Sequence, residues 1–358
     1  MNISTELRQI GVIARLELRR AFLSKRSFWV YLLALFPAVI FFGHAIEVKV
    51  RQDRWSREGT VQPAVLDRLN RGMTYNEVIK AAGTPIRDFE WERRRRDEDD
   101  TVRMRHVLLF DGRRRSDLTF RNDLLESVHT RPLASLDEDR QVFAGVFQFF
   151  FLRVAVFFGC LGIFLNLFRG EMLDKTLHFW LLAPARREVL LLGKYLSGLV
   201  ASSLIFVLGT VLCFAALLWA NDPVEVQQYM NTAAGHELFR YLLATVLGCV
   251  GYGSVFLAAG LLVRNPIVPI VIVLFWESII GFLPQMLQKL SVLYYLQSVC
   301  PVSAPVEEGT PALVRLLLSP AAPSSVWVAV LGLLGLTALV LYAASRVVRK
   351  IEIDYATD

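Results

Sequence analysis

The stretch from Arg169 to Lys194 reads RGEMLDKTLHFWLLAPARREVLLLGK and lies between two long apolar runs. It holds five basic and three acidic residues, with Pro184 in its middle. Because proline disfavours a helical residue before it, the helical pattern is expected to break at Ala183 and to resume near Ala185. The second helix then continues into the next apolar run. The stretch therefore predicts a short helix across the end of a membrane bundle, rigidly joined to a membrane helix and suited to transmitting force.

The rest of the composition is that of a membrane protein. Apolar residues make up 54% of the 358 residues and the mean hydropathy is +0.43, well above the values of soluble domains. Six continuous apolar runs approach the ~17–25 residues that cross a bilayer as a helix, and their continuity favours helices over a β-barrel. We therefore expect an α-helical polytopic membrane protein. The predicted spans are Phe28–Ala45, Val142–Phe168, Tyr195–Ala220, Tyr241–Val263, Ile267–Leu283 and Val326–Ser345.

The distribution of lysine and arginine predicts the orientation of these spans. Cytoplasmic connections carry an excess of basic residues, and an inside N-terminus places the basic residues of segments 1–27, 169–194 and 346–358 on that side. The short connections on the other side hold only Arg240, Lys289 and Arg315. We therefore predict a multi-pass protein of the inner (plasma) membrane with both termini in the cytoplasm. The net charge of +6 reflects this bias and does not indicate nucleic-acid binding.

Residues 1–27 have an amphipathic helical pattern. Arginines fall on one stripe of the helix, and leucine, isoleucine and alanine fall on another. Such a helix lies in the membrane interface with its arginines toward anionic headgroups. The alternative is an ordinary juxtamembrane anchor. The arginines of the stripe are Arg8, Arg15, Arg19 and Arg26, and the apolar residues are Leu7, Ile10, Ala14, Leu18 and Ala21.

Two charged residues, Arg153 and Glu277, lie inside predicted spans. An ionised group in the bilayer core costs a few kcal/mol unless it is paired or hydrated. Counted from the cytoplasmic ends at ~1.5 Å per residue, the two lie at heights that differ by roughly 7 Å, which two long side chains can bridge. One interpretation is a structural ion pair or contact with water in the bundle. The other is that one or both residues line a transport path.

The sequence contains no recognisable catalytic constellation. The motifs GxxxxGK[ST], HExxH and GxSxG are absent, and the five histidines are scattered singly. The cysteines lie in or beside predicted spans without metal-binding spacing, so we interpret them as packing residues, with a disulfide as the alternative. We expect no catalytic residue, no metal site and no cofactor in this chain, and an integral-membrane enzyme is disfavoured. The four cysteines are Cys160, Cys213, Cys249 and Cys300.

The quoted stretch resembles the cytoplasmic loop of the permease subunits of type 2 ABC exporters. In that family the loop after the second span reads E, a few residues, GT, a leucine-rich helix, P, R and then GK; Lys175 replaces the usual glycine here, which affects the local turn but not the register. The amphipathic start, the six spans and the proline-rich outer segment (284–325, a re-entrant segment or loop) are also similar. The matching residues, which the resemblance implies couple the chain to an ATPase, are Glu171, Lys175, Thr176, Pro184, Arg187, Gly193 and Lys194.

The resemblance implies a permease subunit that exports a substrate as a homodimer or heterodimer. Each protomer would dock its coupling helix into a separate ABC ATPase, which binds ATP and Mg²⁺. In this family the second and fifth spans help to line the path between protomers, which makes Arg153 and Glu277 transport-path candidates. The alternative function is a receptor or assembly scaffold that acts through the soluble insert. Lipid, peptide, ion and drug substrates all remain open.

Residues 46–141 form a soluble insert that topology places outside the cytoplasm, since a folded segment of this length crosses largely regardless of charge. The stretch RGMTYNEVIKAAGTP (Arg71–Pro85) and the strand-like stretches after it resemble the small lipoprotein domain of the outer-membrane β-barrel assembly machinery, a fold with helices on an antiparallel sheet. The resemblance implies that Gly83 closes the helix. The implied apolar helix face consists of Met73, Val78, Ile79 and Ala82.

The insert is expected to act at the exit of the path. It would dock an extracytoplasmic protein or restrict substrate release; the alternative is a passive cap. The charged run Glu92–Asp100 is expected to be a solvated loop, with an anionic-ligand site at its four arginines as the alternative.

Overall fold

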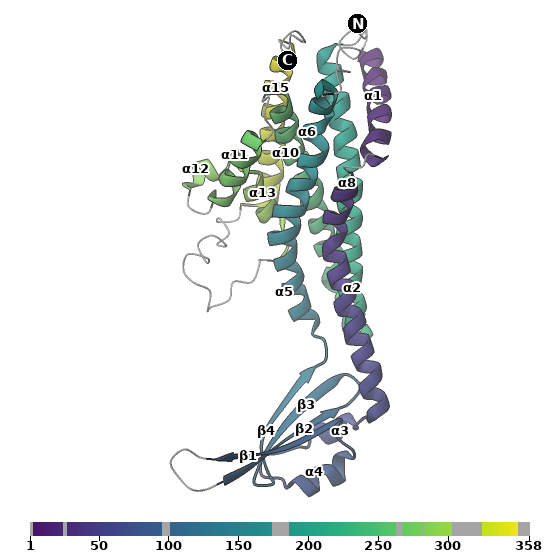
Figure 1. Ribbon diagram of the computed structural model, residues 1–358, viewed down its shortest axis with the longest axis vertical. Coiled ribbons are helices and arrows are strands. Elements are labelled where there is room, and N and C mark those ends of the chain that lie inside the picture. The colour runs from purple at the N-terminus through teal and green to yellow at the C-terminus, as the bar shows by residue number, and fades with distance from the viewer. Residues whose placement is uncertain are drawn as a thin grey trace. The chain divides into compact units, whose positions relative to one another are not determined.

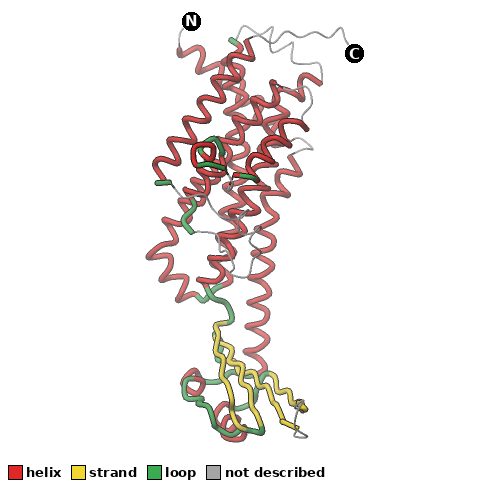
Figure 2. Tube along the Cα trace, turned by 90° about the vertical axis from the view of Figure 1, so that its left-hand side faces the viewer, coloured by secondary structure: helices red, strands yellow, loops and turns green. Residues whose placement is uncertain are grey.

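The computed structural model describes residues 3–23, 27–94, 101–173, 186–262, 267–280, 283–302 and 324–349. The protein is mostly helical and has one small antiparallel sheet (Figures 1 and 2). The chain forms two compact units. The helical unit comprises residues 1–40, 140–215 and 229–358, and the sheet unit comprises residues 41–139 and 216–228.

The described residues contain five helical segments that are long and apolar enough to cross a membrane. Several are longer than the predicted apolar runs, because polar residues without helix breakers continue the helix beyond the apolar part. Thus the first of them continues beyond Ala45 to Glu58, into the predicted insert. The five segments are α2 (Ser27–Glu58), the run α5 (Leu136–Val146), η1 (Phe147–Val156) and α6 (Phe157–Leu173), α8 (Arg187–Ala220), the run α9 (Pro223–Tyr229), η2 (Met230–Ala234) and α10 (Gly235–Leu262), and α15 (Val326–Arg349).

The sixth predicted span, Ile267–Leu283, is not confirmed. Helix α11 (Ile267–Ser278) has 12 residues and is ~18 Å long, whereas a bilayer core is ~30 Å thick. The apolar run continues past Glu277 and Ser278, but the helix ends at Ser278. Beside this end, the Glu277 carboxylate accepts hydrogen bonds from the start of another helix. Two short helices follow in the described residues, α12 (Gln285–Gln288) and α13 (Val292–Val299).

Helix α10 is central to the packing of the helical unit, where it contacts α6, α13 and α15. Helices α2 and α8 approach each other closely at Gly209. A Cβ atom at this position would lie only 2.6 Å from the carbonyl oxygen of Ala34 on α2. A residue with any side chain would therefore push these two helices apart. The four cysteines are buried and free, which agrees with their interpretation as packing residues.

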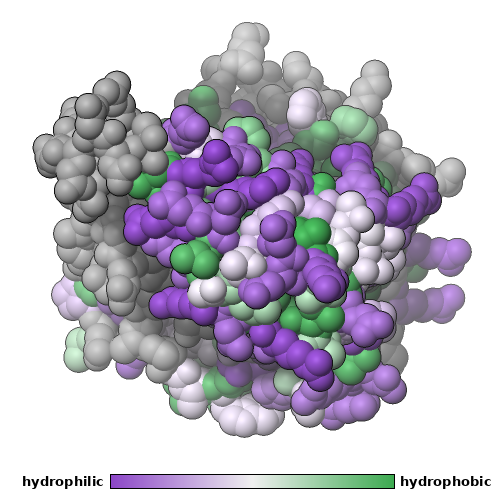
Figure 3. Space-filling model, turned by 90° about the horizontal axis from the view of Figure 1, so that it is seen from below, coloured by the Kyte–Doolittle hydropathy of each residue, from purple (hydrophilic) through white to green (hydrophobic). Residues whose placement is uncertain are grey.

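The sheet unit contains the order β1 (Arg87–Arg94), β2 (Thr101–Phe110), β3 (Arg114–Arg121) and β4 (Leu124–Pro132), with antiparallel neighbours. Helices α3 (Pro63–Leu66) and α4 (Tyr75–Ala82) contribute to its apolar core. The face of this unit visible in Figure 3 is mostly hydrophilic, with scattered apolar residues. Most of the charged run Glu92–Asp100 lies outside the described residues.

Helix α4 follows the predicted pattern. Val78 and Ala82 are buried in the core, and Met73 and Ile79 pack against it, so the predicted apolar face is confirmed. Thr74 and Glu77 form a capping box at its start. Gly83 caps its end with φ of 83°, a conformation that residues with a Cβ atom rarely adopt.

The turn between β2 and β3 depends on the ionised form of Asp111. Its carboxylate accepts hydrogen bonds from the backbone N–H groups of Arg113 and Arg114, at 2.9 and 2.6 Å, and from Nε of Arg114 at 2.8 Å. Burial raises the pKa of Asp111, but these hydrogen bonds outweigh it and hold the pKa below its ordinary value. The carboxylate therefore stabilises the folded turn at neutral pH.

This linkage predicts a loss of stability of the sheet unit in acid. A lowered folded-state pKa contributes stability above the unfolded pKa of about 3.9, and that contribution is lost as the pH falls through the folded-state pKa. Hydrogen-exchange protection of β2 and β3, corrected for the intrinsic pH dependence of exchange, should fall as the pH is lowered from about 3.9 through the folded-state pKa of Asp111. Asp111→Asn should lower protection at neutral pH and flatten the acid dependence. Glu126→Gln, which removes an exposed ion pair with Arg121, is the control; an equal effect there would contradict the assignment.

Candidate functional site

A fully buried lysine lies where three helices of the helical unit meet. The Nζ atom of Lys194 lies 2.8 Å from Oε1 of Glu17 and 2.9 Å from Oε1 of Glu171, and it donates to the carbonyl oxygen of Leu167 at 2.9 Å. Two of the three contacts are hydrogen bonds from the ammonium group, and the contact with Glu171 is an ion pair. Glu17 and Glu171 are also buried. These residues, Glu17, Glu171 and Lys194, are called the Lys194 cluster.

The cluster joins helices that are distant in the sequence. Glu17 belongs to α1 (Ile3–Leu23), Glu171 lies near the end of α6, and Lys194 lies near the start of α8. Gly193 permits this arrangement, because a Cβ atom there would lie 2.8 Å from Cγ2 of Ile13 on α1. The adjacent Gly193 and Lys194 thus have complementary roles: the glycine lets α1 approach α8, and the lysine binds the carboxylate that α1 carries.

The first turn of α8 binds the end of α15. Arg187 donates to the carbonyl oxygens of Val348 and Arg349 at 3.3 and 3.0 Å. The last carbonyls of a helix have no partner within the helix, so Arg187 satisfies groups that would otherwise need water. Glu188 forms an ion pair with Arg349. Exposed pairs of this kind contribute little individually, but together they attach the end of the chain's last membrane helix to α8.

Four of the seven predicted coupling residues are described: Glu171, Gly193 and Lys194 meet in or beside the cluster, whereas Arg187 lies two turns earlier on α8 and binds the end of α15. The other three, Lys175, Thr176 and Pro184, lie outside the described residues. Glu17 was not predicted. The sequence feature that could have identified Glu17 is an acidic residue one turn after Ile13, on the face of α1 that packs on α8.

Glu277 and Arg153, the two charged residues of the predicted spans, have different surroundings. Glu277 is buried, and its carboxylate accepts from the Ser291 hydroxyl at 2.5 Å and from the N–H groups of Val292 and Leu293 at 3.1 and 3.2 Å. These donors form the N-terminus of α13, where an anion is stabilised by the helix dipole. Ser291 also caps α13 by accepting from the N–H of Tyr294 at 3.3 Å.

Arg153 belongs to the π-helical segment η1, and its guanidinium lies 5.4 Å from the centre of the Phe149 ring. In the described residues no ion pair joins it to Glu277, and the place of both residues in the transport path stays a prediction. The start of α13 supplies the Glu277 carboxylate with three donors.

A second, partly buried charge pair was not predicted from the sequence. Arg140 binds Glu237, which also accepts from the Tyr229 hydroxyl at 2.6 Å. The Arg140 guanidinium lies 4.7 Å from the centre of the Tyr229 ring. Arg140 and Glu237 neutralise each other in the helical unit and Tyr229 contacts both, which favours a structural role.

These features define a multi-pass membrane protein whose long apolar helices are joined by buried charged contacts. The family model described as ABC-2 family transporter protein matches residues 12–347, so the chain belongs to this family. It is therefore a membrane permease component of an ABC transporter, and such components generally dimerise and work with an ABC ATPase. No curated protein matches the chain. The comparisons do not support the resemblance of the insert to the small lipoprotein domain.

Proposed function

We propose that this chain is the permease subunit of an ATP-driven exporter and that segment 169–194 couples it to a separate ATPase that binds ATP and Mg²⁺. The observation that carries the proposal is the contact between Lys194 and Glu171 at 2.9 Å, which joins the two ends of this segment. A force applied to the segment then reaches α6 and α8 together, because their adjacent ends are fixed to each other.

Two further features support transmission along this route. Helix α8 is uninterrupted over 34 residues, or ~50 Å, so a displacement of its first turn moves the whole helix. Glu17 adds α1 to the same junction at 2.8 Å from Lys194. We propose that α1 lies in the membrane interface and follows this movement.

The proposed topology places both termini in the cytoplasm of a cell with the chain in its inner (plasma) membrane. The five long helices cross the bilayer, and α11 with its neighbours supplies the sixth predicted crossing. Large apolar side chains that are exposed on the single chain, such as Leu204, Phe275 and Trp327, suit contact with lipid or with a second permease protomer.

Arg153 and Glu277 remain our candidates for the transport path, and the insert is proposed to act outside the cytoplasm. There it would dock an extracytoplasmic protein or restrict release of the substrate. Glu277 is suited to sense movement of α13, since its carboxylate binds the first turn of that helix.

The experiment uses charge reversal at a residue of the coupling segment outside the buried cluster. Lys175→Glu should leave the thermal stability of the purified chain unchanged, but should lower ATPase co-purification and ATP-driven export at least about tenfold. Contacts between exposed charges are screened by salt, so wild-type association should weaken as ionic strength rises.

The matched control is Lys289→Glu, because Lys289 lies in a connection predicted to face the opposite side of the membrane. It should change neither association nor export. Normal ATPase association and export in Lys175→Glu would refute the coupling role of the segment. Loss of ATPase association and of export in Lys289→Glu as well would show that the effect of charge reversal is not specific to the proposed cytoplasmic side.

A further inference from the structure

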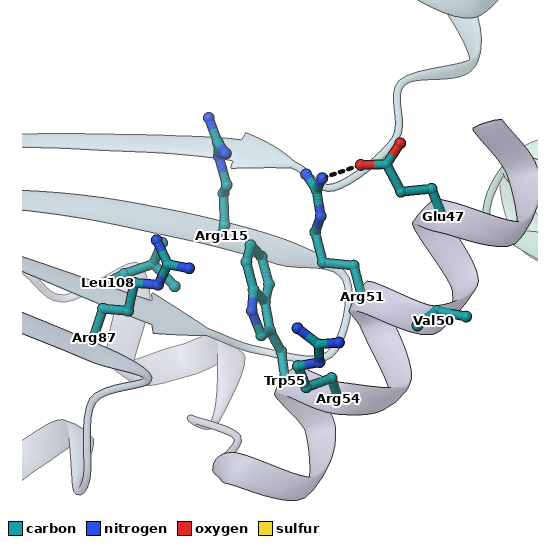
Figure 4. A pocket seen from close by; sticks show the side chains of 8 residues that line it. All are labelled: Glu47, Val50, Arg51, Arg54, Trp55, Arg87, Leu108 and Arg115. Atoms are coloured by element: carbon teal, nitrogen blue, oxygen red, sulfur yellow. Dashed lines mark hydrogen bonds and ion pairs between the residues drawn. The ribbon is translucent and has the colours of Figure 1, made fainter. Parts of the chain in front are cut away.

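A pocket of about 440 Å³ lies within the sheet unit, between the polar end of α2 and strands β1, β2 and β3 (Figure 4). Four of its eight lining side chains are arginines, and one is acidic. The helix contributes one wall and the strands contribute the other. The lining residues are Glu47, Val50, Arg51, Arg54, Trp55, Arg87, Leu108 and Arg115.

The positive charge of this pocket is only partly neutralised. Arg51 forms an ion pair with Glu47 one turn earlier on α2, and Nε of Arg115 lies 3.4 Å from Oδ2 of Asp117. Neither Arg54 nor Arg87 has an acidic partner within ion-pair distance in the described part of the chain. Both are exposed at the pocket, so like charges gather there without a counter-ion of the protein. An anion would relieve this repulsion.

Trp55 gives the pocket a fixed apolar wall. Its side chain is only 8% exposed and packs against Phe110, with ring centres 5.5 Å apart, and against Leu108. The Arg51 guanidinium lies 5.9 Å from the centre of the same indole ring. In Figure 4, Arg51 and Arg54 extend from the helix and Arg87 extends from the facing strand toward Trp55. The site thus combines forked cationic donors with a rigid apolar contact.

We propose that this pocket binds a phosphate group that carries an apolar substituent. Guanidinium groups match the geometry of phosphate oxygens and bind them through paired, charge-assisted hydrogen bonds. Arg54 and Arg87 supply the charge for the phosphate, and the wall formed by Trp55 and Leu108 contacts the apolar substituent. Such a phosphate has two sources, the head group of an anionic phospholipid and a soluble phosphate ester.

The position of the pocket on α2 bears on the source. The uncharged run of α2 ends at Ile46, directly before Glu47, and at ~1.5 Å per residue Arg51 lies ~7.5 Å and Arg54 ~12 Å further along the same helix. The polar layer on each side of a bilayer is ~5–8 Å thick. If the apolar part of α2 ends at the hydrocarbon boundary, Arg51 reaches the headgroup layer and Arg54 lies just beyond it.

The test uses the full chain in nanodiscs of zwitterionic phosphatidylcholine, with binding measured by isothermal titration calorimetry. One arm adds soluble dihexanoyl phosphatidylglycerol, a second adds dihexanoyl phosphatidylcholine, and a third adds inorganic phosphate. We expect saturable binding of the phosphatidylglycerol to the wild type. Arg54→Gln with Arg87→Gln should weaken it about tenfold or more, whereas Arg54→Lys with Arg87→Lys should retain part of the affinity.

The matched control is Arg68→Gln with Arg71→Gln, which removes two exposed arginines of the same unit that also lack an acidic partner among the described residues. This control should bind like the wild type. If only phosphatidylglycerol binds, the bound phosphate belongs to a lipid head group. If inorganic phosphate binds in an arginine-dependent way, the bound phosphate belongs to a soluble compound. Absence of binding by the wild type in every arm would overturn the proposal. So would equal affinities of the wild type and the Arg54→Gln, Arg87→Gln variant, provided that hydrogen exchange shows both to be folded.

Discussion

Lys194→Met is expected to destabilise the full chain by ~3–5 kcal/mol, because it leaves the carboxylates of Glu17 and Glu171 buried without their shared counter-ion. The loss should appear as a lower midpoint of thermal unfolding of the purified chain in detergent. The same variant should also lose ATP-driven export, since α1, α6 and α8 would no longer be joined. This loss of stability is one of the two largest effects that we expect for a single substitution.

Two comparisons separate this effect from a general loss of charge. Combining Lys194→Met with Glu17→Gln and Glu171→Gln should recover part of the stability, because no unpaired charge then remains buried. Arg103→Gln breaks an ion pair with Glu90 at 3.0 Å whose side chains are about half exposed, and it should cost no more than ~1 kcal/mol. A Lys194→Met protein as stable as the Arg103→Gln protein would contradict a structural role for the cluster.

Glu277→Ala should have a comparably large effect. It removes the acceptor of the Ser291 hydroxyl and of the N–H groups of Val292 and Leu293, all of which are buried. Leaving several buried donors without an acceptor is expected to cost ~2–4 kcal/mol. Thermal unfolding in detergent measures the loss. Ser278→Ala is the control on the same helix, because its exposed hydroxyl donates to the carbonyl oxygen of Leu274 four residues earlier.

Glu277→Gln tests whether this residue also has the proposed role in the transport path. The amide oxygen keeps an acceptor for α13 but removes the negative charge. If Glu277 acts in transport, export should fall at least about tenfold while the unfolding midpoint falls less than in Glu277→Ala. Parallel losses of stability and export in both variants would leave only the structural role. An unfolding midpoint of Glu277→Ala equal to that of Ser278→Ala would contradict the capping role as well.

Local patterns in the sequence predicted much of the architecture. Continuous apolar runs predict membrane helices because their backbone groups are satisfied only within the helix. The helix predicted to run from near Ala185 into the next apolar run corresponds to α8, which begins at Arg187 in the described residues; the predicted break at Pro184 lies outside them. In the sheet unit, the buried face of α4 at Val78 and Ala82 and its end at Gly83 are as the resemblance implied. Each of these features depends on residues within a few turns of one another.

Partners across helices were not predictable in the same way. The sequence identifies Lys194 and Glu171 as parts of one motif, but the contact with Glu17 depends on α1 passing over Gly193. The similar heights of Arg153 and Glu277 suggested contact between these two residues, but nothing in the sequence pointed to the start of α13 as the donor to the Glu277 carboxylate. The same contact accompanies the end of α11 at Ser278, short of the predicted span.

The sequence by itself therefore determined which segments are apolar, where helices begin or break, and which charges are costly to bury. Only the tertiary structure decided which group neutralises each buried charge. The physical reason is that hydrophobic periodicity and proline geometry act within one segment, whereas an ion pair forms only if two segments cross at a fixed height. The pocket beside Trp55 is a further case, because its arginines come from α2, β1 and β3 and converge only in the folded unit.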